Sequence, residues 1–222
     1  MVDEPRRIPA EHRADALLWC DAAEPPPAGA GDPARHLDEL RRPLPLEREQ
    51  SGRWTGSGFR SYRPGDDDAG LLAVNNRAFS WHADQGGWDA EDLADRTAAD
   101  WFRAEDLLVH DADDGSGIDG FCWTRFHPAT DDSPAFGEIF AIATDPHRPS
   151  RGLGRALAVA GLDHQTQRGA TVAMLYVERD NAPAQQLYAS MGFTLHRRQV
   201  GYVTGGPTTA RASTRHPDGT AP

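Results

Sequence analysis

The chain has 222 residues, a formal net charge of −11 and a hydrophobic fraction of 38%. No apolar run approaches the roughly 18–20 residues of a membrane helix, and the acidic balance argues against a generic nucleic-acid binder. We therefore expect no membrane and no nucleic-acid partner. The first 20 residues resemble neither a secretory signal nor a transit peptide, because they mix acids with bases and lack an unbroken apolar region, so we expect a cytoplasmic protein.

The first quarter of the chain differs from the rest in composition. Residues 1–56 are rich in proline, glycine and charge, which predicts an N-terminal extension and linker, with one short helix over 11–21. A single core domain is expected over residues 57–205, followed by a disordered tail at 206–222.

Within the core, the period of the apolar residues changes along the chain. A strand is predicted over 59–64, followed by helices over 70–79 and 89–102, the second capped by Asp89. Strands follow over 106–112, 118–128 and 136–146, then a helix over 151–169, a strand over 171–177, a helix over 181–193 and a strand over 194–203. This order predicts an α/β (α+β) fold, a mixed central sheet with helices on both faces.

A glycine-rich joint connects a predicted strand to a predicted helix at "DPHRPSRGLGRALA", residues 145–158. The first N–H groups of a helix have no partner within it, and the helix dipole adds partial positive charge there. Together with Arg148 and Arg151, this joint predicts a site for a phosphorylated ligand.

Several motifs together carry a family resemblance. A strand ending in "DP", the Gly152-x-Gly154 joint and "DNAPAQQLYASMGF" (180–193) resemble the GCN5-related N-acetyltransferases. A closer resemblance, over residues 58 to about 203, is to the C-terminal catalytic half of the tandem mycothiol synthase family, carried by "GFCWTRFHP", "GEIFAIATDP" and "LYVERDNAPAQQLYASMGF". The segment "RHLDELRRPLPL" (35–46) resembles the end of that family's first half, so the extension is expected to be the remnant of a lost half.

The resemblance implies a reaction. Acetyl-CoA would be the co-substrate, with no metal, and the acceptor would be the cysteinyl amine of cysteinyl-glucosaminyl-inositol, giving mycothiol. Glu138 corresponds to the family's base and Tyr188 to its general acid, and a phenol with an ordinary pKa near 10 stays protonated at neutral pH. Without the resemblance, Glu138 could be a solvent-facing edge residue and Tyr188 ordinary core packing.

The resemblance also implies the binding residues. Those expected to hold the coenzyme are Ile142, Ala143, Thr144, Pro149, Ser150, Arg151, Gly152, Leu153, Gly154, Arg155, Asn181, Ala182, Pro183, Ala184, Gln185 and Gln186. Those expected to bind the acceptor are Asp84, Arg125, Glu138 and Tyr176. Three positions depart from the pattern: Pro149 has no N–H for a phosphate, Asp84 stands where glutamate is usual, and Arg125 where lysine is common. Asn181 could instead be only a helix cap.

Other candidate groups are read as structural. The histidines His82, His110, His127 and His164 show no metal-ligand spacing, and Cys122 lies in an alternating strand as a small core residue. Two alternative hypotheses for the function remain: an N-acetyltransferase for another small amine, and a non-catalytic acyl-CoA-binding module. The chain is expected to be a monomer.

Overall fold

The computed structural model describes residues 8, 12–47, 58–115, 117–148 and 151–204. Its strands are Leu17–Asp21 (β1), Ala30–Pro43 (β2), Phe59–Ser61 (β3), Leu107–Asp111 (β4), Ile118–His127 (β5), Phe136–Thr144 (β6), Val172–Glu178 (β7) and Thr194–Thr204 (β8). They form one sheet in the order β1-β8-β2-β7-β6-β5-β4-β3. β6 and β7 pair in parallel and the other described pairs are antiparallel, so the predicted mixed sheet is confirmed.

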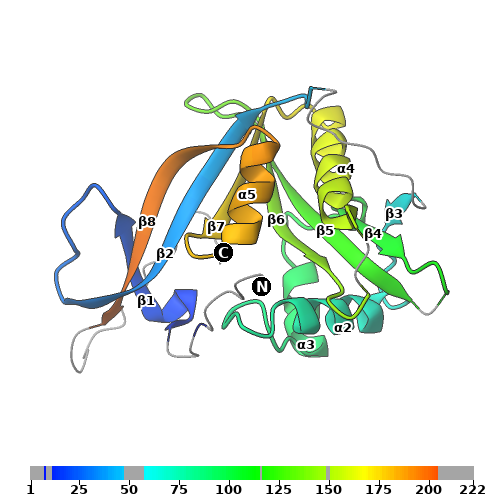
Figure 1. Ribbon diagram of the computed structural model, residues 1–222. Helices are drawn as coiled ribbons and strands as arrows, with labels where there is room; N and C mark the ends of the chain where they lie inside the picture. Colours follow the sequence, from blue (N-terminus) through cyan, green and yellow to red (C-terminus); the bar gives the residue numbers. More distant parts are fainter. Residues whose placement is uncertain (1–7, 9–11, 48–57, 116, 149–150, 205–222) are drawn as a thin grey trace.

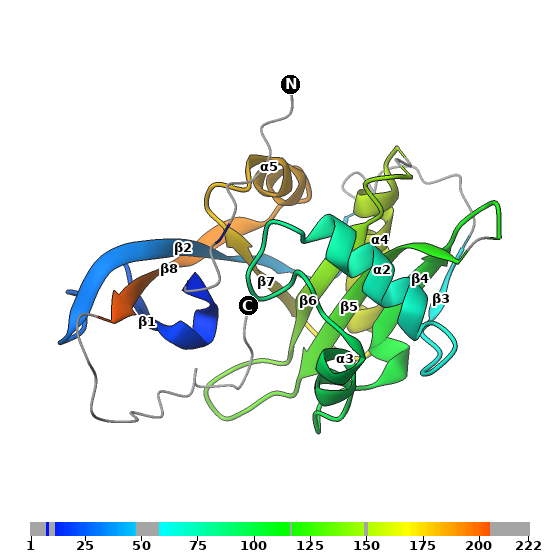
Figure 2. The same ribbon diagram turned by 90° about the horizontal axis from the view of Figure 1, so that it is seen from below.

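Helices cover both faces of this sheet, as predicted (Figure 1). Asp68–Ala78 (α2) and Ala90–Thr97 (α3) lie on one face, which Figure 2 shows from below, and Leu153–Gln167 (α4) and Ala182–Ser190 (α5) lie on the other. Short 3-10 turns occupy Ala14–Ala16 and Ala104–Asp106. The capping of α3 by Asp89 is confirmed, because its side chain accepts N–H groups of Glu91 and Asp92.

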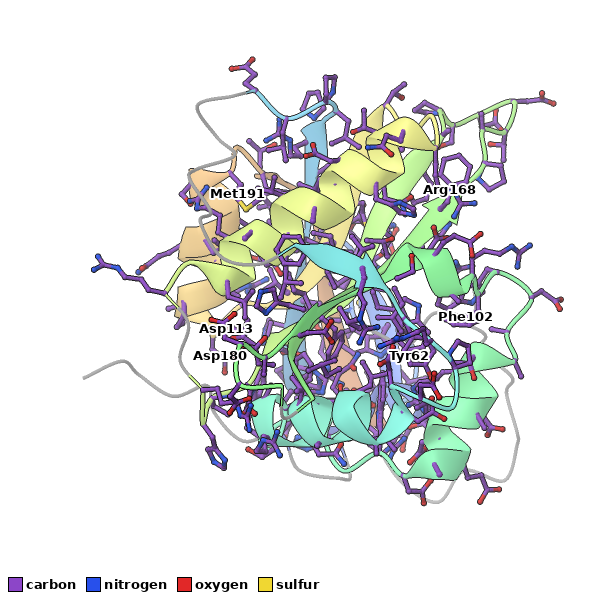
Figure 3. The ribbon with its side chains drawn as sticks, turned by 90° about the vertical axis from the view of Figure 1, so that its right-hand side faces the viewer. Tyr62, Phe102, Asp113, Arg168, Asp180 and Met191 are labelled. Carbon is purple, nitrogen blue, oxygen red and sulfur yellow. The ribbon has the colours of Figure 1, made fainter. Side chains whose placement is uncertain are left out.

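Each face has its own hydrophobic core. On the α4 and α5 side, Leu153 and Leu157 pack with Leu175 and Met191. On the α2 and α3 side, Leu71 and Tyr62 belong to a second cluster of buried residues. Phe102 packs against this cluster (Figure 3). The helix expected over 89–102 ends at Thr97, since the chain turns there and Phe102 packs onto Trp123 with ring centroids 5.4 Å apart.

Two predictions for the N-terminal region are wrong. The helix expected over 11–21 is wrong, because Ala14–Ala16 forms only a 3-10 turn and Leu17–Asp21 pairs with β8 as an edge strand. A linker over 1–56 is wrong for Ala30–Pro43, a fourteen-residue strand that lies between β7 and β8. Its charged residues suggested a solvated segment, but ion pairs across the sheet let Arg35 and Glu39 be buried there. Residues 1–7, 9–11 and 48–56, and the expected tail 206–222, lie outside the described residues.

The sheet opens at the junction of β6 and β7. Their pairing runs from Phe136↔Val172 to Ile139↔Leu175 and stops there, although both strands continue. On the other side of β6, the register with β5 shifts between Trp123 and Thr124, which leaves Phe140 outside the pairing. Such a bulge bends the strand that carries it. In Figure 1 the sheet accordingly opens into two arms, with α5 beside the gap.

Candidate active site

A cavity of about 130 Å³ lies where β6 and β7 separate. It is lined by residues of β6 and β7, of the segment after α2, and of α5, together with Leu37 of β2. The cavity brings together five of the expected site residues: Ile142, Tyr176, Asn181, Ala184 and Tyr188. Because β6 loses its partner beyond Ile139, its main-chain polar groups on this side are available to an extended ligand.

Glu138 lies on β6 one residue before the end of the β6–β7 pairing. Its residue is only 4% exposed, so a solvent-facing edge position is wrong. Its Oε2 lies 2.8 Å from Nε2 of His127, and it is paired in register with Arg125 of β5. The sequence offered no spacing signal for His127, since its ring reaches Glu138 through strand pairing and stacks on Phe136 with centroids 4.1 Å apart.

Tyr188 projects from α5 into the same opening. It is 6% exposed, lines the cavity and contacts the Phe193 ring edge-on at 5.6 Å. Burial raises the pKa of Tyr188 well above its ordinary value near 10, so the phenol keeps its proton at neutral pH. The position therefore combines core packing with a proton donor at the cavity wall.

The glycine-rich joint forms the N-terminus of α4. Gly152 is the N-cap and has φ 89°, a conformation that a residue with a side chain rarely adopts. Gly154 is different, because a Cβ there would have only Thr144 Cγ2 in contact, at 3.8 Å. The fold would therefore accept a residue with a side chain at position 154. Leu153 is fully buried, and Pro149 and Ser150 lie outside the described residues.

Asp145 anchors the start of that joint. It accepts two hydrogen bonds from Arg77 of α2, at 3.0 and 2.7 Å, and one from the N–H of His147. Burial alone would raise the pKa of Asp145, but these partners outweigh it and lower the pKa. The "DP" motif therefore ties the joint to the helix on the opposite face.

The first turn of α5 holds the remaining coenzyme candidates. Asn181 is the N-cap of α5, and its side chain accepts a hydrogen bond from the N–H of Ala184, as expected for a helix cap. Asn181 also lines the cavity. Pro183 stands in the first turn, where its missing N–H is tolerated. Gln185 donates to Asp38 of β2 at 3.4 Å.

Asp84 lies beside the cavity rather than in its wall. Its carboxylate accepts from Arg35 at 2.5 Å and from the N–H of Ala14 at 2.8 Å. Arg35 also donates to Glu178 at 2.5 Å, and all three charged residues are buried. Burial raises the pKa of Glu178, and Arg35 opposes that rise. The role of Arg35 could not be predicted, because the segment that carries it was expected to be a linker.

A row of polar residues crosses five neighbouring strands on one face. Strand pairing places Arg125 opposite Glu138, and Glu138 opposite Met174. Tyr176 follows Met174 by one strand period and pairs with Glu39, which pairs with Arg197. Burial, and then the charge of Glu39, raise the pKa of Tyr176 to about 12. Three of the four expected acceptor residues therefore lie in one row, which Glu39 and Arg197 extend.

Cys122 is fully buried, and burial raises its pKa to about 12, as fits a core residue. Among the described residues, no three His, Cys, Asp or Glu side chains are grouped so that they could hold a metal ion. No described helix has both the length and the apolar composition needed to cross a bilayer.

Comparisons with known proteins identify relatives. Mycothiol acetyltransferases of Acidimicrobium ferrooxidans, Segniliparus rotundus and Rhodococcus opacus are 46, 40 and 41% identical over 76, 78 and 77% of this chain. These matches confirm the expected resemblance. They cover 54, 65 and 56% of the relatives, so the chain spans between half and two thirds of the length of these proteins.

Solved structures share the fold. A GCN5-related N-acetyltransferase from Sphaerobacter thermophilus matches with a TM-score of 0.62 and 18% identity, over 87% of this chain and 62% of its own. A tandem GNAT protein from the clavulanic acid biosynthesis pathway matches with a TM-score of 0.53 and 14% identity, over 81 and 56%. The model of the acetyltransferase (GNAT) family matches residues 75–193, more than half of the chain. The chain therefore belongs to the acetyltransferase (GNAT) family.

Proposed function

We propose that this chain is an acetyl-CoA-dependent N-acetyltransferase that acetylates the cysteinyl amine of cysteinyl-glucosaminyl-inositol, giving mycothiol. The observation that carries the proposal is the opening between β6 and β7, which has Tyr188 in its wall and begins next to buried Glu138, one residue before the end of the strand pairing. The relatives named mycothiol acetyltransferases support the choice of acceptor.

The residues of the opening fit a coenzyme with a long polar arm and a pyrophosphate. Beyond its pairing with β7, strand β6 offers main-chain groups of Ile142, Ala143 and Thr144 to the arm. The N-terminus of α4, with Leu153, Gly154 and Arg155, offers N–H groups and partial positive charge to the pyrophosphate. Gly154 leaves room for the close approach of a phosphate to the main chain.

The proposed chemistry is direct transfer. Glu138 accepts a proton from the acceptor ammonium, directly or through water, because only the neutral amine has a lone pair for attack. The amine nitrogen then bonds to the thioester carbonyl carbon, the carbon–sulfur bond breaks, and the nitrogen releases its second proton to water. Tyr188, which its raised pKa keeps protonated before the reaction, donates its phenolic proton to the departing thiolate and regains a proton from water. His127 holds the Glu138 carboxylate in position.

The proposal includes a cytoplasmic location, since acetyl-CoA is a cytoplasmic metabolite. It also includes a monomeric state. Light scattering during gel filtration tests the monomer, and a fluorescent fusion in the producing cell tests the location.

The first experiment is calorimetric titration of the chain with acetyl-CoA, followed by thiol release when cysteinyl-glucosaminyl-inositol is added. We expect binding, and thiol release that is faster with this amine than with cysteamine or glucosamine at equal concentration. Release that is faster with one of the other amines would overturn the acceptor assignment. Binding of acetyl-CoA without release from any amine would overturn the enzyme assignment in favour of a binding module.

A further inference from the structure

The row of polar residues continues beyond the residues assigned to the reaction. Glu39 of β2 and Arg197 of β8 lie next to Tyr176 on the same face, and Arg41 follows Glu39 by one strand period. β2 lies outside the region that the family model matches, and so does β8. These three residues therefore lie outside that matched region, and none of them is among the site residues that the resemblance implies.

Glu39 is the centre of this group. It is 0% exposed, and its carboxylate accepts from Nε of Arg41 at 2.6 Å and from Nε of Arg197 at 3.2 Å. The side chains of Arg41 and Arg197 are 37 and 44% exposed. The structure thus fixes the inner edges of two guanidinium groups with a buried anion, while part of each group faces solvent.

Tyr176 connects this group to the cavity. Its side chain hydrogen-bonds to Arg197 and also lines the cavity between β6 and β7. The charges of both Glu39 and Glu138 act on its phenol. The two guanidinium groups therefore lie beside the place where the acceptor amine must reach Glu138.

A stability role alone accounts poorly for this arrangement. Burying a carboxylate carries a desolvation penalty that its ion pairs often only offset, and half-exposed pairs add little to stability. The same contacts are well suited to recognition, because a guanidinium offers five N–H donors in a planar fork and loses less freedom on binding when it is already held.

We propose that Glu39 is a positioning residue that holds Arg41 and Arg197 as a binding subsite for the hydroxyl-rich part of the acceptor, remote from its reacting amine. This inference rests on the proposed function, which supplies an acceptor with such a part. The N-terminal strand β2 thereby builds one wall of the acceptor site.

The test compares Arg197→Met and Glu39→Gln with a matched control, Arg198→Met. Arg198 is the next residue of β8, pairs with Asp38 and lies on the opposite face. Two acceptors are used, cysteinyl-glucosaminyl-inositol and cysteinamide, which keeps the reacting amine and lacks every hydroxyl. Free glucosaminyl-inositol is also titrated by calorimetry into the chain with coenzyme A present, a readout that needs no turnover.

We expect Arg197→Met and Glu39→Gln to raise KM for the full acceptor about 10- to 100-fold, as for loss of hydrogen bonds from a charged group. kcat and KM for acetyl-CoA should change less than about threefold, rates with cysteinamide should not change, and binding of glucosaminyl-inositol should weaken in parallel. Arg198→Met should match the original chain in every assay, and Glu39→Asp should recover part of the loss.

Equal losses with both acceptors, or loss of kcat without a rise in KM, would overturn the subsite and indicate a structural role. Failure of the original chain to bind glucosaminyl-inositol would overturn it as well, even if thiol release with another amine showed an active acetyltransferase. Binding of glucosaminyl-inositol without thiol release would instead keep the subsite and overturn the proposed function.

Discussion

The two arms of the sheet differ in how they serve the site. The arm from β3 to β6, with α4, holds Glu138 and the glycine-rich joint, and β7 leads into the motif on α5 that holds Tyr188. The strands β2, β8 and β1 lie outside the region that the family model matches, yet β2 buries Arg35 and Glu39 on the face that Glu138 shares. Motifs therefore located the reacting groups, whereas the opposite wall depends on residues that lie outside the matched region. Four substitutions, with Arg198→Met and Gly152→Ala for comparison, separate the two contributions.

The largest expected effect belongs to the arm that holds Glu138. Glu138→Gln removes the base but keeps the size and burial of the side chain. We expect kcat to fall about 10²- to 10⁴-fold, as for loss of general base catalysis, with unchanged affinity for acetyl-CoA by calorimetry. Thiol release within threefold of the original rate would show that another group takes the proton.

In the other arm, the expected effect is on stability. Arg35→Met leaves Asp84 and Glu178 buried without their cation, which we expect to lower the free energy of unfolding by about 3–5 kcal/mol. The measurement is urea unfolding followed by circular dichroism. The exposed Arg198→Met should change it by less than about 0.5 kcal/mol. Similar values for both variants would refute the importance of the buried group.

His82, in the segment after α2, ties the two arms together and gives a pH test. Burial, and then the charge of Arg35, lower the pKa of His82 to about 3, against about 6.5 when unfolded. Between these values the unfolded chain binds more protons, so stability is present above pH 6.5 and is lost as the pH falls towards 3. At its steepest the loss is about 1.4 kcal/mol per pH unit.

The variant His82→Gln isolates this contribution. Its free energy of unfolding should fall less steeply than that of the original chain between pH 6.5 and 4, and the two slopes should agree above pH 7. Parallel curves over the whole range would show that the His82 ring has the same pKa in the folded and the unfolded chain.

The smallest effect sharpens the role of the glycine-rich joint. Gly154→Ala should raise the free energy of unfolding by about 0.5–1 kcal/mol, because alanine favours the helix and its Cβ has room. The same change should weaken acetyl-CoA binding, since the Cβ narrows the approach to the main chain. Gly152→Ala should instead destabilise the chain, because φ is 89° there. Unchanged acetyl-CoA affinity in Gly154→Ala would exclude a phosphate contact at this residue.

Most of the core could be predicted from its periodicity. The strands and helices beyond Phe59 appear close to their expected ranges, because long apolar patterns and turn residues specify them locally. The fate of Ala30–Pro43 could not be predicted, since its partners β7 and β8 are more than a hundred residues away and its charges become buried only through them. The sequence indicated Glu138 and Tyr188 through motifs, but Glu39, Arg35 and His127 through no local signal.

The position of β2 also has a consequence for how the chain folds. Both neighbours of this strand come late in the sequence, and β8 is the last element of the described fold. Until β7 and β8 have been made, neither edge of β2 has its native partner, and its charged side chains help to keep those edges from pairing with other chains. Contacts between such distant segments slow folding, because the intervening chain must be ordered first. The pairing of β2 with β7 and β8 is therefore expected to be a late step. Rapid-mixing refolding monitored by tryptophan fluorescence, in the original chain and in Trp19→Phe, would follow it.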